Sequence, residues 1–237
     1  MLSFTEENYL KALLTLSTTK ESDERVGTNE IAGRLQVKPA TANDMLKRLK
    51  DKGLIEYEKY GKITLTASGR ERAVVVLRKH RLWETFLYEK LEFTWDEVHE
   101  VAEQLEHIQS EKLVDKLDKF LDYPEFDPHG DPIPKPDGTI SAINRLTLSD
   151  MDEKQYCKVV AVKDTSVEFL QYAQLLGLGI NNQIQVLRKH PYDLLTEIEI
   201  NGKQLTVGQK IMDNIYVVCL QCEAGKECTN RKCSLNL

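Results

Sequence analysis

The sequence lacks an apolar run long enough to cross a membrane, and its first residues have the pattern of a helix rather than of a secretory signal. It also lacks an even number of cysteines: there are five, and four of them (Cys219, Cys222, Cys228 and Cys233) lie within the last 19 residues. An odd number excludes a complete disulfide framework and favours free thiols in a reducing compartment. We therefore expect a cytoplasmic protein that does not associate with membranes.

Charge is unevenly distributed along the 237 residues, although the net charge is only −6. Residues 25–81 hold 14 Lys and Arg against 6 Asp and Glu, a net of +8, whereas residues 82–154 hold 7 against 19, a net of −12. A basic segment favours polyanions such as nucleic acid, and an acidic segment favours cations. The pattern indicates a polyanion-binding module followed by a cation-binding module.

The first third of the chain has the pattern of a helix-turn-helix. Ser3 and Glu6 form a capping-box signature ahead of one amphipathic helix, and Thr28 is suited to cap a second, shorter one. Pro39 stands where the first residue of a third helix belongs, and Gly53 follows the expected end of that helix. Two short helices joined by a tight turn, the second rich in polar and basic side chains, are typical of helix-turn-helix DNA-binding domains.

A β-hairpin is predicted directly after these helices. Ile55 and Tyr57 alternate with charged residues on one strand, Ile63 and Leu65 lie on the return strand, and Tyr60-Gly61 makes the turn. The combination predicts a winged helix that binds double-stranded DNA, with a plain α+β mini-domain as the alternative. We expect base edges and phosphates to be contacted by Lys38, Pro39, Thr41, Asn43, Asp44, Lys47, Arg48, Lys59 and Lys62.

A long helix is expected next, capped by Thr66 and running to about Leu91. It carries more apolar residues than one small domain can cover, so we infer a partner helix from a second copy of the chain across a two-fold axis. The chain is thus predicted to form a homodimer. His80 and Glu84 lie four residues apart and share one face of this helix.

The stretch from Trp95 to Phe120 is expected to form one helix that holds a metal ion. His99, Glu103, Glu106 and His107 fall at i, i+4, i+7 and i+8, in one sector of the helix beside the apolar stripe. Two imidazoles and two carboxylates next to a buried stripe are suited to bind a cation. The alternative is an acidic surface helix with two incidental histidines, because short His/Glu patterns are common.

The last part of the chain is predicted to be a small SH3-like β-barrel behind a stiff connector. Five of the seven prolines lie between Pro124 and Pro136. Short strands are expected at 156–162, 183–187, 194–200, 203–207 and 214–220, with a short helix at 167–176 and a hairpin turn at Asn201-Gly202. For the tail, with its C-x2-C-x5-C-x4-C spacing, a Zn²⁺ site, reactive thiols and disorder all remain open.

Several segments resemble the diphtheria toxin repressor family, the metal-dependent winged-helix repressors that include the manganese transport regulators. The resemblance extends from about residue 4 to about residue 220 and is carried by Arg78-Lys79-His80-Arg81-Leu82, Asp96-Glu97-Val98-His99, Leu105-Glu106-His107 and Gly130-Asp131-Pro132-Ile133-Pro134. It implies an α+β protein with a winged helix-turn-helix domain at 1–72, a helical dimerisation and metal-binding domain at 73–123, a Pro-rich linker at 124–150, an SH3-like, FeoA-like domain at 151–220 and a Cys-rich tail at 221–237.

The resemblance also implies two metal sites per subunit. Site one corresponds to His80, Glu84, His99, Glu168 and Gln171, and site two to Asn8, Glu103, Glu106 and His107. Iron-responsive members have Cys and Met where this chain has Glu103 and Asn8, whereas small manganese regulators have Glu and Asp there, and a further Glu in place of Lys11. Oxygen and imidazole ligands without thiolate favour Mn²⁺ over Fe²⁺.

The sequence thus predicts a homodimeric repressor, activated by Mn²⁺ or Fe²⁺, that binds pseudo-palindromic operators of metal uptake and homeostasis genes and is not an enzyme. Two other functions remain open. One is a metallohydrolase that uses the His/Glu cluster, although no separate general base or nucleophile is apparent. The other is a winged-helix DNA-binding protein that does not depend on metal.

Overall fold

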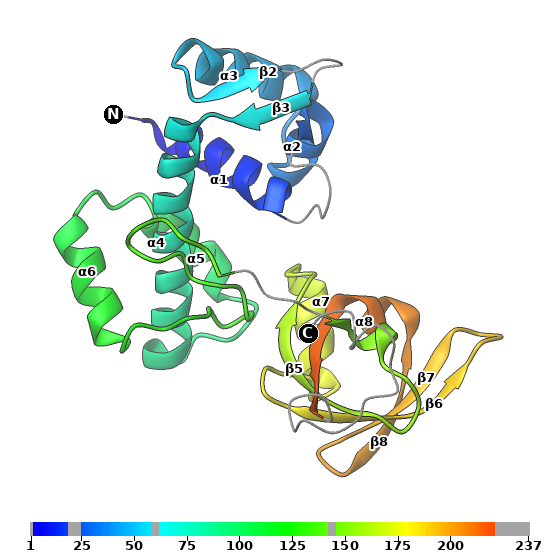
Figure 1. The fold of residues 1–237 in the computed structure, drawn as a ribbon. Coiled ribbons are helices and arrows are strands. Elements are labelled where there is room, and N and C mark those ends of the chain that lie inside the picture. The colour runs from blue at the N-terminus through cyan, green and yellow to red at the C-terminus, as the bar shows by residue number, and fades with distance from the viewer. Residues whose placement is uncertain (1, 19–24, 58–61, 142–145, 221–237) are drawn as a thin grey trace. The chain divides into compact units, whose positions relative to one another are not determined.

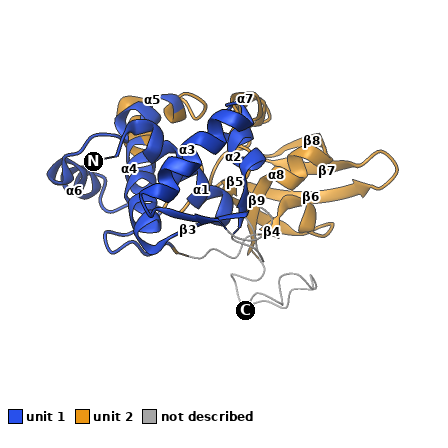
Figure 2. Cartoon of the chain, turned by 90° about the horizontal axis from the view of Figure 1, so that it is seen from above, with its two compact units in different colours: residues 1–83, 100–125, 133–140 blue, residues 84–99, 126–132, 141–237 orange. Residues whose placement is uncertain are grey.

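A computed structural model describes residues 2–18, 25–57, 62–141 and 146–220 (Figure 1). The chain divides into two compact units, which Figure 2 distinguishes by colour. Unit 1 comprises residues 1–83, 100–125 and 133–140, and unit 2 comprises residues 84–99, 126–132 and 141–237. Within the described ranges, no helix is both long and apolar enough to cross a bilayer.

The first part of unit 1 is a winged helix-turn-helix, as the sequence predicts. Its elements are α1 (Phe4–Thr18), β1 (Val26–Gly27), α2 (Thr28–Arg34), α3 (Pro39–Asp51), β2 (Ile55–Tyr57) and β3 (Lys62–Leu65). The strands form an antiparallel sheet in the order β1-β3-β2. Leu10, Ile31, Leu46 and Ile63 are fully buried and join the helices and the sheet in one core.

The expected helix starts are present, with one difference. The amide of Glu6 donates to Ser3 Oγ at 3.3 Å and the amide of Ser3 donates to Glu6 Oε2 at 2.9 Å, so the capping box forms. Thr28 does not cap α2, because Gly27 takes the cap position and donates its amide to the Glu30 carboxylate at 2.7 Å. Gly27 is held extended by pairing of β1 with β3, a pairing that the local sequence does not reveal.

The helical part of the chain differs from its prediction at one point that matters for the site. The long helix α4 (Ala67–Leu91) begins after Thr66, whose Oγ1 accepts from the amide of Gly69 at 3.1 Å. The stretch expected as one helix is two, α5 (Val98–Leu105) and α6 (Glu111–Phe120). The prediction of one helix is wrong because the chain turns after Leu105, and Ser110 caps a new helix by accepting from the amide of Leu113 at 3.3 Å.

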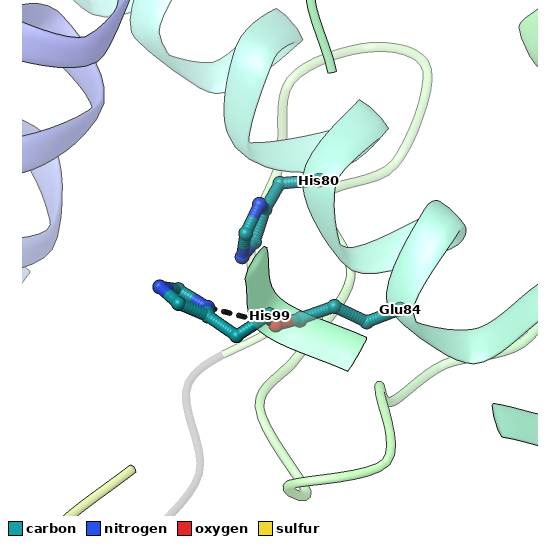
Figure 3. A group of neighbouring side chains, drawn as sticks. All are labelled: His80, Glu84 and His99. Carbon is teal, nitrogen blue, oxygen red and sulfur yellow. Dashed lines mark hydrogen bonds and ion pairs between the residues drawn. The ribbon is translucent and has the colours of Figure 1, made fainter. Parts of the chain in front are cut away.

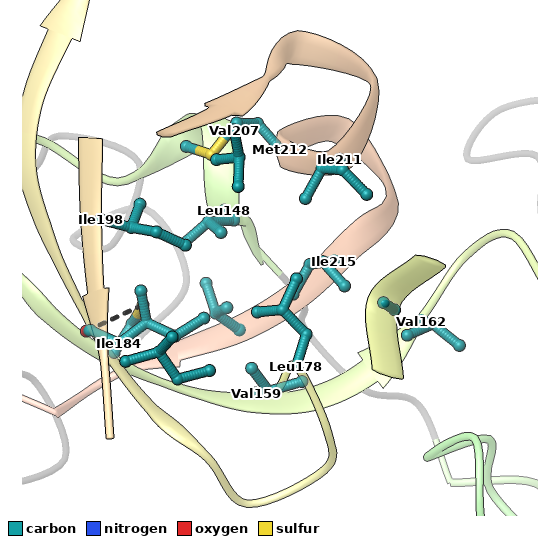
Figure 4. Packing of buried hydrophobic residues seen from close by; sticks show 14 of the residues in the cluster. Leu148, Val159, Val162, Leu178, Ile184, Ile198, Val207, Ile211, Met212 and Ile215 are labelled. Atoms are coloured by element: carbon teal, nitrogen blue, oxygen red, sulfur yellow. Dashed lines mark hydrogen bonds between the residues drawn. The ribbon is translucent and has the colours of Figure 1, made fainter. Parts of the chain in front are cut away.

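Unit 2 contains the β-barrel. Its sheet is antiparallel in the order β4-β9-β5-β6-β7-β8, and its elements are β4 (Leu146–Thr147), η2 (Leu148–Asp150), β5 (Tyr156–Val162), α7 (Val167–Leu175), β6 (Gln183–His190), β7 (Leu195–Ile200), β8 (Lys203–Gly208), α8 (Gln209–Asn214) and β9 (Ile215–Cys219). Figure 4 shows its apolar core. The sheet begins inside the segment expected to be linker, because Leu146 and Thr147 pair with β9 and Leu148 is fully buried.

Candidate metal centre and DNA-binding surface

Glu106 lies at the centre of a buried polar cluster in unit 1. Its side chain is fully buried in the turn after α5, and its Oε2 accepts from Lys11 Nζ at 2.7 Å and lies 2.6 Å from His80 Nδ1. Burial raises the pKa of Glu106, but the hydrogen bond from His80 and the charge of Lys11 outweigh it, so the pKa lies below its ordinary value. Glu106 is therefore a buried carboxylate that stays ionised at neutral pH.

The other oxygen of Glu106 faces a group formed by Asn8 and His107. His107 is buried, with its Nδ1 2.6 Å from Glu7 Oε2 and its ring stacked on Phe4 at a centroid distance of 4.4 Å. With its nitrogen turned inward, the Asn8 amide donates to Glu106 Oε1 at 3.2 Å and to His107 Nε2 at 3.0 Å. Glu7 thus orients the imidazole so that Nε2 faces Asn8 and Glu106.

These three residues fit a divalent ion. The inward atom of the Asn8 amide lies 3.2 Å from Glu106 Oε1 and 3.0 Å from His107 Nε2. Glu106 Oε1 and His107 Nε2 lie 3.8 Å apart. Neighbouring ligands of an octahedral ion with bonds of about 2.1 Å stand about 3 Å apart. A half-turn of the Asn8 amide brings its oxygen inward, so that three lone-pair atoms converge. Glu103, the fourth predicted ligand of site two, is 46% exposed and contacts Lys11 at 3.5 Å.

Three of the five residues predicted for site one lie together. His80 and Glu84 lie one turn apart on α4, and His99 comes from α5 (Figure 3). One ligand atom of each residue lies within 4.8 Å of the other two. His99 Nδ1 is 3.1 Å from Glu84 Oε1, and Glu84 is buried whereas His99 is partly exposed. An imidazole–carboxylate–imidazole group of this kind suits a first-row divalent metal.

Glu84 belongs to a second possible ligand group, which lies in unit 2 and which the sequence analysis missed. Asp127 and His129 complete it, all three residues are buried, and their ligand atoms lie within 4.8 Å of one another. His129 Nδ1 is 3.9 Å from Glu84 Oε1, while its Nε2 is 3.0 Å from the Trp95 carbonyl oxygen. The only local signal was an Asp and a His two residues apart in the Pro-rich stretch, and nothing in the sequence connects them to Glu84.

The structure does not bring Glu168 and Gln171 into either group. Both residues are exposed on α7. Gln171 Nε2 donates to Asp96 Oδ2 at 2.9 Å, and this hydrogen bond, together with one from Thr94, holds the pKa of Asp96 below its ordinary value. Among the described residues, Glu168 belongs to neither of the two groups that contain Glu84. A role for these two residues in site one stays a prediction.

The predicted DNA-contacting residues lie mostly on one exposed face. Lys38, Pro39, Thr41, Asp44, Lys47 and Arg48 are exposed, and Asn43 and Lys62 are half-buried. On the opposite face of α3, Leu46 and Leu49 are fully buried. Some basic side chains have acidic neighbours, since Lys47 Nζ lies 3.5 Å from Asp44 and Lys62 Nζ lies 4.0 Å from Glu30. Lys59 lies outside the described residues.

One of the four cysteines predicted for the tail site lies in the barrel. Cys219 is in β9, opposite Cys157 of β5, and both side chains are buried and outside any disulfide. Burial, with a smaller contribution from Cys219, raises the pKa of Cys157 to about 12, so this thiol stays protonated. Cys222, Cys228 and Cys233 lie outside the described residues. Cys219 therefore belongs to the barrel core rather than to the tail.

Comparison with known proteins decides the family. Models of the iron dependent repressors match the N-terminal DNA-binding domain at residues 1–63 and the metal-binding and dimerisation domain at 66–135, and a FeoA domain matches at 146–219. A solved manganese-dependent transcriptional repressor in complex with manganese is 33% identical, with a TM-score of 0.81 over 91% of this chain and 100% of that chain. This chain belongs to the metal-dependent transcriptional repressors. The resemblance inferred from its motifs is thereby confirmed.

Two curated relatives show how much of the chain is similar in sequence to known repressors. The iron-dependent repressor IdeR of Mycobacterium leprae is 35% identical over 130 residues, which are 55% of each chain. The diphtheria toxin repressor of Corynebacterium jeikeium is 29% identical over 187 residues, 78% of this chain and 77% of that protein. The match to IdeR thus spans about half the length of that relative. Both relatives are named as repressors, and this chain matches the family models of their DNA-binding domain and of their metal-binding and dimerisation domain.

Proposed function

We propose that this repressor is a homodimer whose binding to operator DNA is activated by Mn²⁺ or Fe²⁺. The observation that supports it most is the convergence of Asn8, Glu106 and His107. Asn8 comes from α1 in the DNA-binding domain, and the other two residues come from the metal-binding domain. These residues would hold a divalent ion, whose positive charge would offset that of the buried carboxylate. Asn8 would turn its amide oxygen inward, while Glu7 keeps His107 Nε2 directed at the same point.

This arrangement links the metal site to the DNA-binding surface through α1. Leu10 and Leu14, on the same helix as Asn8, are fully buried in the core that also contains α2 and α3. Any shift of Asn8 is therefore transmitted to the helix-turn-helix. A change from about 1:99 to 99:1 between inactive and active forms requires roughly 5.5 kcal/mol of differential metal affinity. We attribute that free energy to the two multidentate sites of each subunit.

We propose the second ion at Glu84, held with His80 and His99 or with Asp127 and His129. Both groups offer only oxygen and imidazole ligands, as does the Glu106 site, and this chemistry favours Mn²⁺ over Fe²⁺. Zn²⁺ binding by the Cys-rich tail and a cytoplasmic location stay predictions. The dimer is supported by apolar side chains that unit 1 exposes on and after α6, where Leu113, Phe120 and Tyr123 are 40%, 64% and 61% exposed.

Metal-dependent gel shifts test this function. Operator sequences are first selected from random double-stranded DNA with Mn²⁺ present, and we expect a pseudo-palindrome whose half-sites lie about one helical turn apart. Binding of that DNA is then compared with Mn²⁺, with Fe²⁺ and with a chelator. Equal binding in the chelator would refute metal activation, and metal-dependent turnover of a phosphate or peptide ester would support the metallohydrolase instead. Operators in front of metal uptake genes are the expected targets.

A charge variant on α3 tests the proposed DNA surface. Lys47→Ala is expected to weaken binding to all DNA sequences alike. The slope of log Kd against the logarithm of the salt concentration should fall by about 1, because each phosphate contact releases condensed cations. The control is Lys112→Ala, which removes an exposed lysine from α6. Titrations at several salt concentrations measure both variants. An unchanged salt dependence for Lys47→Ala would show that this side chain does not contact DNA phosphates.

A further inference from the structure

Lys11 of α1 contacts side chains that are themselves proposed metal ligands. Its Nζ donates to Glu106 Oε2 at 2.7 Å and to Glu103 Oε1 at 3.5 Å, and it lies 3.4 Å from His80 Nδ1. The side chain of Lys11 is only 11% exposed and that of Glu106 is fully buried. An ammonium group therefore neutralises, inside the protein, the same carboxylates that a divalent ion would neutralise.

Lys11 and a divalent ion compete for this position. An ion bound through Glu106 Oε1 would share one carboxylate with the ammonium on Oε2, and two cations at that separation repel each other in a poorly solvated site. Ligation by Glu103, or by both oxygens of Glu106, would need the two atoms to which Lys11 now donates. Lys79, a second buried lysine among the described residues, feels the charges of Glu7 and Glu106, but its Nζ donates to the Ile108 carbonyl oxygen at 3.3 Å rather than to a carboxylate.

We propose that Lys11 is an internal cation that occupies the Glu106 site in the metal-free repressor and must withdraw before a divalent ion binds. Lys11 thereby sets the metal concentration at which the repressor responds. The proposal rests on the metal activation proposed above and adds a residue that lowers the affinity of the site without being a ligand. Lys11 would have two effects: it stabilises the metal-free form, and it lowers the affinity of the site for a divalent ion.

Direct titration of Mn²⁺ tests the proposal. Both the parent and the Lys11→Met chain carry Glu84→Ala, which removes the ligand common to the two other groups and leaves the Glu106 site to be measured. Electron paramagnetic resonance of free Mn²⁺ then gives the affinity without DNA. We expect Lys11→Met to bind Mn²⁺ at least about tenfold more tightly, which corresponds to about 1.4 kcal/mol. Its melting temperature should fall in chelator and should approach that of the parent in saturating Mn²⁺.

Matched variants separate this role from a merely structural one. Lys52→Met removes another lysine bound to an α1 carboxylate, that of Glu6 at 2.7 Å, and should leave the Mn²⁺ affinity unchanged. Lys11→Arg keeps the charge and should bind Mn²⁺ no more tightly than the parent. Lys11→Gln, which still donates to Glu106, should bind more tightly than the parent and serves if Lys11→Met does not fold without metal.

An Mn²⁺ affinity of Lys11→Met and Lys11→Gln equal to or weaker than that of the parent would overturn the proposal. So would an equal loss of melting temperature with and without Mn²⁺. These outcomes are distinct from failure of the proposed function, because metal dependence of DNA binding is measured on the unaltered chain. A repressor that responds to Mn²⁺ while Lys11→Met gains no affinity refutes only the role of Lys11.

Discussion

Glu106→Ala is expected to abolish Mn²⁺ binding at the site formed by Asn8, Glu106 and His107 and to lower the free energy of unfolding of the metal-free protein by about 3 kcal/mol. Glu106 is fully buried, and its Oε2 is the partner of both Lys11 and His80. Its removal leaves an ammonium group and an imidazole in a site with little water. Breaking a buried ion pair by deleting one partner typically costs about 3–5 kcal/mol.

The control for this variant is Glu103→Ala, one turn earlier on α5. Glu103 is 46% exposed and lies 3.5 Å from the same ammonium group, so its loss should cost less than about 1 kcal/mol. Urea denaturation in chelator measures the stability of both variants, and Mn²⁺ titration measures the site. Equal losses of stability for the two variants would show that burial of Glu106 is not what makes its pairing strong.

Gly130→Ala is expected to lower the free energy of unfolding of the barrel by about 3 kcal/mol and to disrupt the group formed by Glu84, Asp127 and His129. Gly130 has φ of +83°, and a Cβ there would lie 1.9 Å from the Val160 carbonyl oxygen of β5. The loop must then move off the strand, and Asp127 and His129 move with it. Strain at positive φ and overpacking each cost about 1–3 kcal/mol.

A second glycine of the barrel separates the two costs. Gly177 also has positive φ, +73°, but a Cβ there would meet nothing within 4 Å. Gly177→Ala should therefore cost only the conformational strain, about 1 kcal/mol. Hydrogen exchange of the Val162 amide, which donates to the His129 carbonyl oxygen at 3.0 Å, reports on the loop directly. Protection of that amide in Gly130→Ala equal to that in Gly177→Ala would contradict the predicted displacement.

Local patterns in the sequence were sufficient for the order and type of most elements. The capping box of Ser3 and Glu6, Pro39 at the start of α3 and the β-hairpin of β2 and β3 depend on residues that are close in the chain. Each is decided by backbone conformation and by hydrogen bonds that form over a few residues. Spacing along α4 likewise placed His80 and Glu84 on one face, because one turn of a helix separates them.

Only the tertiary structure decided how the ligands are grouped. The helix expected to carry four of them ends at Leu105, where buried Glu106 pairs with Lys11, 95 residues away. Asp127 and His129 join Glu84 through a loop whose position depends on Gly130 against β5. The sequence alone determined which residue types can bind metal. Which of them meet, and that a lysine lies among them, depends on packing between segments far apart in the chain, which no local pattern encodes.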